Sequence, residues 1–181
     1  MEQQNQNTAL LVMDMQAGIL GRYLKAPELT ANVAKAIAAA RGNNIKVIYV
    51  IVGFRPGAPE RKVPKGEDNP FAKIDMEAFM KIDSALEPLP DEIVVVKRRI
   101  SAFTGSDLEV ILRAPGIQHL ILTGYATSGV ILSTYCEASD KDYKLTILAD
   151  CCGNADEVVH DVLINKVFPR MATIASLETL W

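Results

Sequence analysis

The chain has 181 residues, of which 49% are hydrophobic and 23% are charged, and these are ordinary proportions for a soluble globular protein. Because this length is enough for one sizeable core, we expect residues 1–181 to form a single domain. The formal net charge of −3 excludes the strongly basic surface of a nucleic-acid-binding protein. No apolar run approaches the ~20 residues that a membrane-spanning helix needs.

Six apolar runs of strand length recur along the chain, with helical patterns between most of them. The runs lie at Thr8–Met13, Lys46–Val52, Glu92–Val96, His119–Leu122, Lys144–Leu148 and Ala172–Ala175. Alternation of strands and helices favours an α/β fold with helices on both faces of a mainly parallel sheet. The runs are continuously apolar, as expected for strands that are covered on both faces.

Helical patterns connect these runs. The helices are expected at Leu29–Arg41, from Ser106 to about Arg113, from Ser128 to about Ala138 and from Asp156 to about Lys166. Gly42 stands where a C-cap glycine belongs. The sequence Ser-Asp-Leu-Glu at 106–109 is typical of a capping box at a helix start.

The segment from Gly53 to Asp91 differs from the rest of the chain. It holds six of the nine prolines, which are Pro56, Pro59, Pro64, Pro70, Pro88 and Pro90. We interpret it as a long excursion from the sheet with one helix near Met76–Leu86. Excursions of this length inside a compact domain are usually functional, so a lid or an interface between subunits is expected here.

Polar residues stand at the tips of the strand-like runs. Asp14 ends the first run and Lys97 ends the third, while the fourth leads through a glycine-containing turn, Thr123 to Thr134, into a helix. The carboxyl ends of parallel strands meet at the edge where ligands bind, and a helix N-terminus favours an anion there. This combination predicts a hydrolytic site. Taken alone, Asp14 is also typical of a turn cap, and Lys97 of a solvated strand end.

Three segments, in this order, resemble the isochorismatase-like hydrolases, also called the cysteine hydrolase superfamily. They are LLVMDMQ around Asp14, VVVKRRISAF around Lys97, and TGYATSGVILST from Thr123 to Thr134. The segment LTILADCC, followed by His160, matches the closing part of the family, so the resemblance covers nearly the whole chain. It implies a three-layer Rossmann-like fold with strand order 3-2-1-4-5-6, and a homo-oligomer that acts on a small-molecule substrate.

The resemblance also implies the roles of the site residues. Asp14 would be the general acid/base, with its pKa raised by partial burial. Lys97 would hold Asp14 ionised or stabilise developing negative charge. A non-proline cis peptide bond would join Tyr125 and Ala126, and the N–H groups of Ala126 and Val130 would bind an oxyanion. The pocket would be lined by Phe54, Phe103, Tyr125 and Gly129, with Phe103 in the SAF motif of the family. Arg55, Arg98 and Arg99 are candidates to bind substrate carboxylates.

One position departs from the family pattern. Most members carry a nucleophilic Cys where this chain has Val130, and a valine side chain cannot attack a substrate. Cys136 lies nearly two helical turns further along and cannot reach the site. Cys151 and Cys152 follow the fifth strand at the correct edge of the sheet, so a displaced thiol stays an alternative.

No metal and no cofactor are predicted. The nicotinamidase branch carries an Asp-x-His arrangement after the second strand, whereas Val50 to Pro56 contain no histidine. His119 and His160 are isolated and do not have metal-ligand spacing, and we interpret His160 as structural. The hydroxyls of Thr127 and Ser128 are interpreted as helix caps.

The main hypothesis is a small-molecule hydrolase that acts through Asp14 and Lys97 without a cysteine nucleophile, at a vinyl-ether or C–N bond. True isochorismatases set the precedent that the resemblance implies, since they lack the Cys and cleave a vinyl ether by protonation from an Asp. Two alternatives remain: a non-catalytic ligand-binding member of the family, and an amidohydrolase using a displaced Cys. The polar start, Met1 to Asn7, and three cysteines without secretory context predict a cytoplasmic protein that contacts neither nucleic acid nor membrane.

Overall fold

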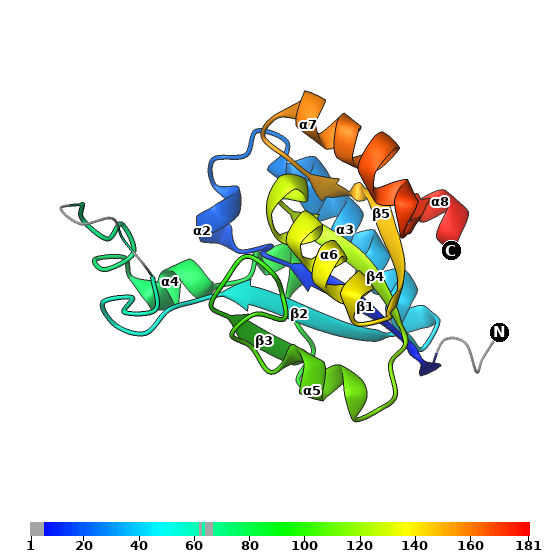
Figure 1. Ribbon diagram of the computed structural model, residues 1–181, viewed down its shortest axis with the longest axis horizontal. Helices are drawn as coiled ribbons and strands as arrows, with labels where there is room; N and C mark the ends of the chain where they lie inside the picture. Colours follow the sequence, from blue (N-terminus) through cyan, green and yellow to red (C-terminus); the bar gives the residue numbers. More distant parts are fainter. Residues whose placement is uncertain (1–5, 62, 64–66) are drawn as a thin grey trace.

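A six-stranded sheet forms the centre of the computed structural model, which describes residues 6–61, 63 and 67–181. The strand order is β3-β2-β1-β4-β5-β6, and all paired neighbours are parallel (Figure 1). The strands are β1 (Thr8–Met13), β2 (Lys46–Val52), β3 (Ile93–Lys97), β4 (His119–Tyr125), β5 (Lys144–Gly153) and β6 (Thr173–Ala175). The predicted α/β class, the parallel sheet and the order 3-2-1-4-5-6 are confirmed.

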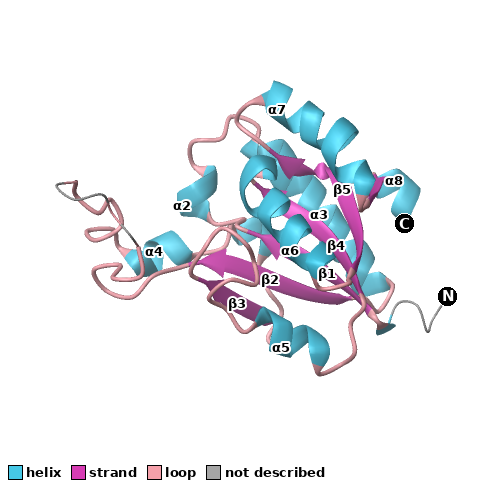
Figure 2. Cartoon of the chain, in the orientation of Figure 1, coloured by secondary structure: helices cyan, strands magenta, loops and turns pink. Residues whose placement is uncertain are grey.

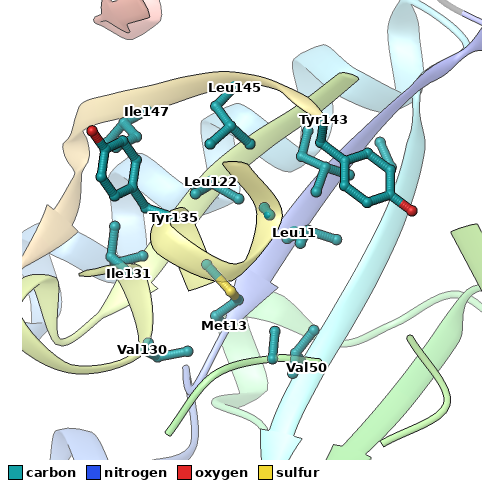
Figure 3. Packing of buried hydrophobic residues seen from close by; sticks show 14 of the residues in the cluster. Leu11, Met13, Val50, Leu122, Val130, Ile131, Tyr135, Tyr143, Leu145 and Ile147 are labelled. Atoms are coloured by element: carbon teal, nitrogen blue, oxygen red, sulfur yellow. The ribbon is translucent and has the colours of Figure 1, made fainter. Parts of the chain in front are cut away.

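Helices cover both faces of this sheet (Figure 2). The helices of the described residues are α2 (Ala17–Leu20), α3 (Ala26–Gly42), α4 (Met76–Met80), α5 (Leu108–Arg113), α6 (Leu132–Asp140), α7 (Glu157–Val162) and α8 (Leu177–Leu180). The central strand β1 is buried along its whole length. Leu11 and Met13 belong to the core cluster that contains residues of α5 and α6, and Leu10 and Val12 belong to the cluster that contains residues of α3. Figure 3 shows the first cluster. Two apolar faces on one strand explain the continuous hydrophobic run.

The ends of α3 differ from the prediction. The helix begins at Ala26, three residues before Leu29, with Pro27 in its first turn, where proline is well tolerated. Gly42 is the last helical residue and not a left-handed cap. The chain leaves the helix through Asn43 and Asn44, and Asn44 takes the positive φ of 56°. Asparagine tolerates this conformation better than most residues, which is why a glycine is not needed there.

The predicted capping box before α5 does not form. Asp107 is the N-cap residue, and its side chain makes no capping hydrogen bond. The Ser106 hydroxyl donates to the carbonyl of Ala102 at 2.6 Å and accepts from the N–H of Leu108 at 3.2 Å, which is not the N–H of Glu109 that a capping box requires. Glu109 does not reach back to the helix start, because its carboxylate pairs with Lys141 at 2.6 Å. A tertiary ion pair therefore replaces the local motif.

The Pro-rich excursion is less regular than predicted. In place of one helix over 76–86, α4 and the 3₁₀ turn η1 (Ser84–Leu86) are separated by an extended Lys81. The next residue, Ile82, forms an antiparallel bridge with Gln16. Figure 1 shows α4 beyond the carboxyl end of β2. Pro64 lies outside the described residues.

Two helices begin or continue with turns that are not α-helical, since π-helical turns are wider and 3₁₀ turns are tighter. The helix predicted from Ser128 starts as the π-helical turn η2 (Thr127–Ile131) and continues as α6. Helix α7 continues as the π-helical turn η3 (Leu163–Val167) and the 3₁₀ turn η4 (Phe168–Arg170).

Within the described part of the chain, no helix is long and apolar enough to cross a membrane.

Candidate active site

Asp14 and Lys97 form a buried ion pair at the carboxyl ends of the strands. Lys97 Nζ lies 2.9 Å from Asp14 Oδ2, and the two side chains are 2% and 11% exposed. Asp14 follows β1, and Lys97 is the last residue of β3. Since β2 lies between these strands, the long lysine side chain spans the end of β2. The two groups therefore meet at the edge predicted from the sequence.

The backbone fixes both members of this pair. The Asp14 N–H donates to the carbonyl of Val50 on β2 at 2.8 Å, and Asp14 takes a left-handed φ of 56°. Lys97 Nζ also donates to the carbonyls of Arg99 and Ile100, each at 3.0 Å. With Asp14, these carbonyls use all three ammonium hydrogens. Lys97 is thus held in place by the loop that follows its own strand.

The electrostatic state of Asp14 suits proton transfer. Burial raises the pKa of its carboxyl group to about 6, although the charge and the hydrogen bond of Lys97 lower it. Among the described residues, Asp14 Oδ1 is buried and has no hydrogen-bond partner. A carboxyl group with one free oxygen and a pKa near neutrality is able to give or take a proton at a bound molecule.

The end of β4 approaches β1 closely. A Cβ atom at Gly124, whose φ is 131°, would collide with the carbonyl oxygen of Met13, so the glycine of the Thr-Gly-Tyr sequence is required by space. The peptide bond between Tyr125 and Ala126 is cis, as the resemblance implied. This turn leads directly into η2, so that the start of the helix lies beside Asp14.

Two hydroxyls tie this turn to the end of β5 and do not cap the helix, which corrects the prediction. Thr127 Oγ1 donates to the carbonyl of Gly153 at 2.9 Å and lies 2.9 Å from His160 Nδ1. Because the single hydroxyl proton goes to Gly153, His160 Nδ1 donates to Thr127. The Ser128 N–H and hydroxyl both donate to Asn154 Oδ1, at 3.1 and 2.7 Å. These bonds give His160 the structural contact that was predicted.

A cavity of about 660 Å³ opens over the ion pair. It is lined by Asp14, Ile19, Val52, Phe54, Arg61, Phe71, Phe79, Lys97, Arg98, Arg99, Ile100, Tyr125, Ala126, Gly129 and Val130. Most of the predicted site residues are therefore brought together. Val130 is only 2% exposed, and Figure 3 shows it at the same end of the core cluster as Met13 and Val50.

Phe103 and Arg55 do not line this cavity. Phe103 is buried in the core cluster, with its ring stacked on Tyr143 at a centroid distance of 5.9 Å and Lys141 Nζ over its face. Its prediction as a pocket residue is wrong, because apolar partners on the α5 and α6 side take up the ring. Arg55 is paired with Glu60 at 2.6 Å.

Six cavity residues were not predicted from the sequence, namely Ile19, Val52, Arg61, Phe71, Phe79 and Ile100. Three of them, Arg61, Phe71 and Phe79, come from the excursion. No hydrophobic periodicity in the excursion distinguishes these three residues. The one sequence feature that points to a pocket there is the presence of aromatic residues in a segment rich in proline.

None of the three cysteines lines the cavity. Cys151 and Cys152 are buried in β5, and burial raises the pKa of each thiol far above its ordinary range. Cys152 Sγ lies 3.7 Å from the carbonyl of Leu122. Cys136 is exposed on α6. Since the thiolate is the nucleophile, this arrangement disfavours the displaced-thiol alternative.

The two histidines lie apart. His119 contacts the hydroxyls of Thr8 and Thr146 near the starts of their strands, and His160 bonds to Thr127. In the described ranges, no group of three or more His, Cys, Asp or Glu residues is arranged to hold a metal ion. A site without metal stays a prediction.

Comparison with known proteins identifies relatives of this chain. The family model for the isochorismatase domain matches residues 8–179. An uncharacterised isochorismatase family protein, YecD of Escherichia coli O157:H7, is 34% identical over 177 residues, covering 96% of this chain and 94% of the relative. The ureidoacrylate amidohydrolase RutB of Pseudomonas syringae pv. syringae is 32% identical over 202 residues, covering 96% and 78%.

Solved structures share the fold. An isochorismatase family protein from Burkholderia thailandensis superposes with a TM-score of 0.87 at 28% identity, covering 97% of this chain and 94% of that one. The N-carbamoylsarcosine amidase of Thermoplasma acidophilum superposes with a TM-score of 0.76 at 23% identity, covering 95% and 97%. At that lower identity, the likeness concerns the fold alone.

Proposed function

This chain belongs to the isochorismatase family of hydrolases, and from that premise we propose that it hydrolyses a small molecule through Asp14 and Lys97 without a cysteine nucleophile. Asp14 acts as general acid, and Lys97 controls its charge. The scissile bond is a vinyl ether or a C–N bond. In this proposal Val130 takes the place that the nucleophilic Cys has in most of the family, so no covalent intermediate forms on the protein.

The proposed step for a vinyl ether balances with water alone. Neutral Asp14 gives its proton to the terminal vinyl carbon, and a water molecule adds to the resulting oxocarbenium carbon. The proton that this water loses returns to Asp14, and the hemiketal breaks down to a carbonyl compound and an alcohol. Lys97 stabilises the carboxylate while it is ionised. The N–H groups of Ala126 and Val130 would bind a negatively charged oxygen of the substrate.

The observation that carries the proposal is the free oxygen of a buried carboxyl group at the cavity. Asp14 Oδ1 has no hydrogen-bond partner in the described structure, and burial raises the pKa of the group to about 6. Leaving a buried oxygen without a partner costs stability, and such costs persist at functional sites. The non-catalytic alternative leaves this arrangement without a role, since a binding protein does not need a group that gives or takes a proton.

A substrate panel tests the proposal. Purified protein is assayed against vinyl ethers, ureido acids, amides and imides, with iodoacetamide-treated protein and the Asp14→Asn variant in parallel. We expect at least one class to be hydrolysed, with activity that survives thiol alkylation and is lost in Asp14→Asn. Activity that is abolished by alkylation and kept in Asp14→Asn would contradict the proposal and favour a thiol hydrolase.

The assembly, the lid and the cellular setting are part of the same proposal. We expect a cytoplasmic homo-oligomer, with the excursion over 53–91 as a lid or as part of the interface. The excursion and its neighbours expose apolar residues such as Ile74, Leu89 and Ile93, which is a feature of interaction surfaces. Light scattering is expected to give a mass above the 19.8 kDa of one chain, and a monomer mass would contradict this expectation.

A further inference from the structure

Strand β3 is an edge of the sheet, and part of its backbone is left unpaired within the described chain. It pairs with β2 alone. The Gly53 N–H donates to the Lys97 carbonyl at 3.2 Å, so the backbone groups of Lys97 face β2. Because this direction alternates along a strand, those of Val95 face β2 as well, and the N–H and C=O groups of Val94 and Val96 point away from the sheet. We call these four outward groups the free edge.

The chain itself closes both ends of the free edge. On the same side of the strand, the Glu92 N–H donates to the Leu89 carbonyl at 3.0 Å. The Arg98 N–H reaches the Thr104 carbonyl at 3.4 Å. Between these two positions, the free edge takes part in no hydrogen bond of the described residues. Any strand that pairs with β3 must therefore do so at its centre.

The surface around the free edge suits a protein partner. An open hollow of about 610 Å³ lies there, lined by Arg55, Val94, Val96, Arg98, Gly105, Ser106 and Asp107. Ile93 and Val94 are 43% and 40% exposed. Proteins usually protect an edge strand with a charge, a proline or a covering segment, and among the described residues Ile93–Val96 carry none of these. An unprotected apolar edge of this kind is a template for strand pairing.

The charges at the two ends of β3 identify the partner. Asp91 precedes the strand and Arg99 follows it, and both are exposed. Neither takes part in an ion pair of the described residues. When two copies of β3 run antiparallel, the acidic start of each approaches the basic end of the other. A two-fold axis produces this arrangement, in which one patch contacts itself.

We propose that a second copy of this chain binds along β3, with the two β3 strands antiparallel, so that two six-stranded sheets join into one. The register that uses the whole free edge pairs Val94 with the partner's Val96 and places the two-fold axis at Val95. All four outward groups then have a partner, and exposed valines cover one another. Since one chain lines the cavity over Asp14, the inference specifies the assembly expected above without bearing on hydrolysis.

Light scattering of two matched variants tests the pairing. Val94→Lys places a charge in the contact, while Val158→Lys makes the same change at an exposed valine of α7, and circular dichroism checks both folds. The unmodified protein and Val158→Lys are expected to form the same oligomer. Val94→Lys should raise the dissociation constant of the contact by about tenfold or more, because a buried charge without a partner is costly. A monomer mass for the unmodified protein, or an oligomer that Val94→Lys leaves intact, would overturn the inference.

Hydrogen exchange of the unmodified protein tests the free edge without any variant. The amide of Val95 faces β2 and serves as the internal control, because it is protected within one chain. Nuclear magnetic resonance reads each amide separately. The amides of Val94 and Val96 are expected to be protected in the same way. Fast exchange at both, beside slow exchange at Val95, would show that no strand pairs there.

Charge reversal tests the antiparallel direction. Asp91→Arg and Arg99→Asp should each weaken self-association about fivefold, as expected for exposed ion pairs that occur twice in a two-fold contact, and the double variant should restore it. Mass is the measurement, because Arg99 also lines the cavity. Single variants without effect, or a double variant without restoration, would overturn the arrangement. A substrate panel without turnover would defeat the proposed hydrolase and leave these results unchanged, whereas an oligomer insensitive to Val94→Lys would defeat the edge pairing and leave the hydrolase standing.

Discussion

Two regions face the cavity, and they are held in different ways. The strand ends supply Asp14 and Lys97, which are buried, joined at 2.9 Å and tied to neighbouring backbone. The excursion supplies Arg61, which is held by contacts with phenylalanine rings on the same segment. Groups fixed by the core keep one geometry, whereas groups on a loop are free to change without cost to the core. On the proposed function, the reacting groups are fixed by the sheet, while the excursion contributes part of the cavity lining.

The largest effect is expected at the strand ends. Asp14→Asn keeps the shape of the side chain but cannot donate an acidic proton, so kcat/KM on the best substrate of the panel should fall about 10²–10⁴-fold. Steady-state kinetics measures this loss, and circular dichroism checks that the variant is folded. Asp91→Asn, at an exposed position before β3, is the control and should keep full activity. If both variants were equally active, catalysis would not depend on the buried pair.

The sequence predicted the site residues at the strand ends better than those on the excursion. Asp14 and Lys97 each end a continuous apolar run, and the shared edge of parallel strands brings such residues together. Arg61 and Phe71 lie in a segment without periodicity, so only the folded excursion turns them toward the cavity. The sequence predicts Thr127 as a helix cap, whereas its actual partner, Gly153, lies 26 residues further on. Local patterns do not contain such distant contacts.

A thiol introduced at position 130 tests whether this residue lies where most of the family carries the nucleophilic cysteine. Val130→Cys would place a sulfur atom beside Lys97 and the start of a helix, and both lower a thiol pKa below the ~8.5 of a free cysteine. We expect the new thiol to react with iodoacetamide about tenfold faster than the exposed Cys136 does. Mass spectrometry of the labelled peptides measures the two rates. A residue-130 thiol that stays inert at pH 8 would mean that this position is not the seat of the family nucleophile.

The pH dependence of the reaction reports the state of Asp14. With the pKa raised to about 6 by burial, the neutral acid predominates below pH 6 and disappears above it. If Asp14 is the general acid, kcat/KM should be level below about pH 6 and should fall as pH rises through that value, up to about tenfold per pH unit. Lys97→Met removes the charge that lowers this pKa and should move the midpoint to higher pH. A rate that rises through pH 6 would instead assign Asp14 the role of a base.

The smallest expected effect concerns the hydrogen bonds of Thr127, which join the turn after β4 to the end of β5. Thr127→Val deletes a buried hydroxyl and leaves the Gly153 carbonyl and His160 Nδ1 without their partner. The free energy of unfolding should fall by about 1–3 kcal/mol, as measured by chemical denaturation. Thr104→Val, which removes an exposed hydroxyl bonded to Glu137, should change it by less than about 0.5 kcal/mol. Equal effects in the two variants would show that the hydrogen bonds of Thr127 do not stabilise the turn.

The most direct test of the central claim is the activity of a protein without thiols. Cys136→Ser, Cys151→Ala and Cys152→Ala are combined, folding is checked by circular dichroism, and kcat/KM is measured on the best substrate beside Asp14→Asn. Catalysis by Asp14 and Lys97 predicts a value within about twofold of the unmodified protein for the thiol-free variant and a loss of about 10²-fold or more for Asp14→Asn. A folded thiol-free variant without activity, beside an active Asp14→Asn, would contradict the account.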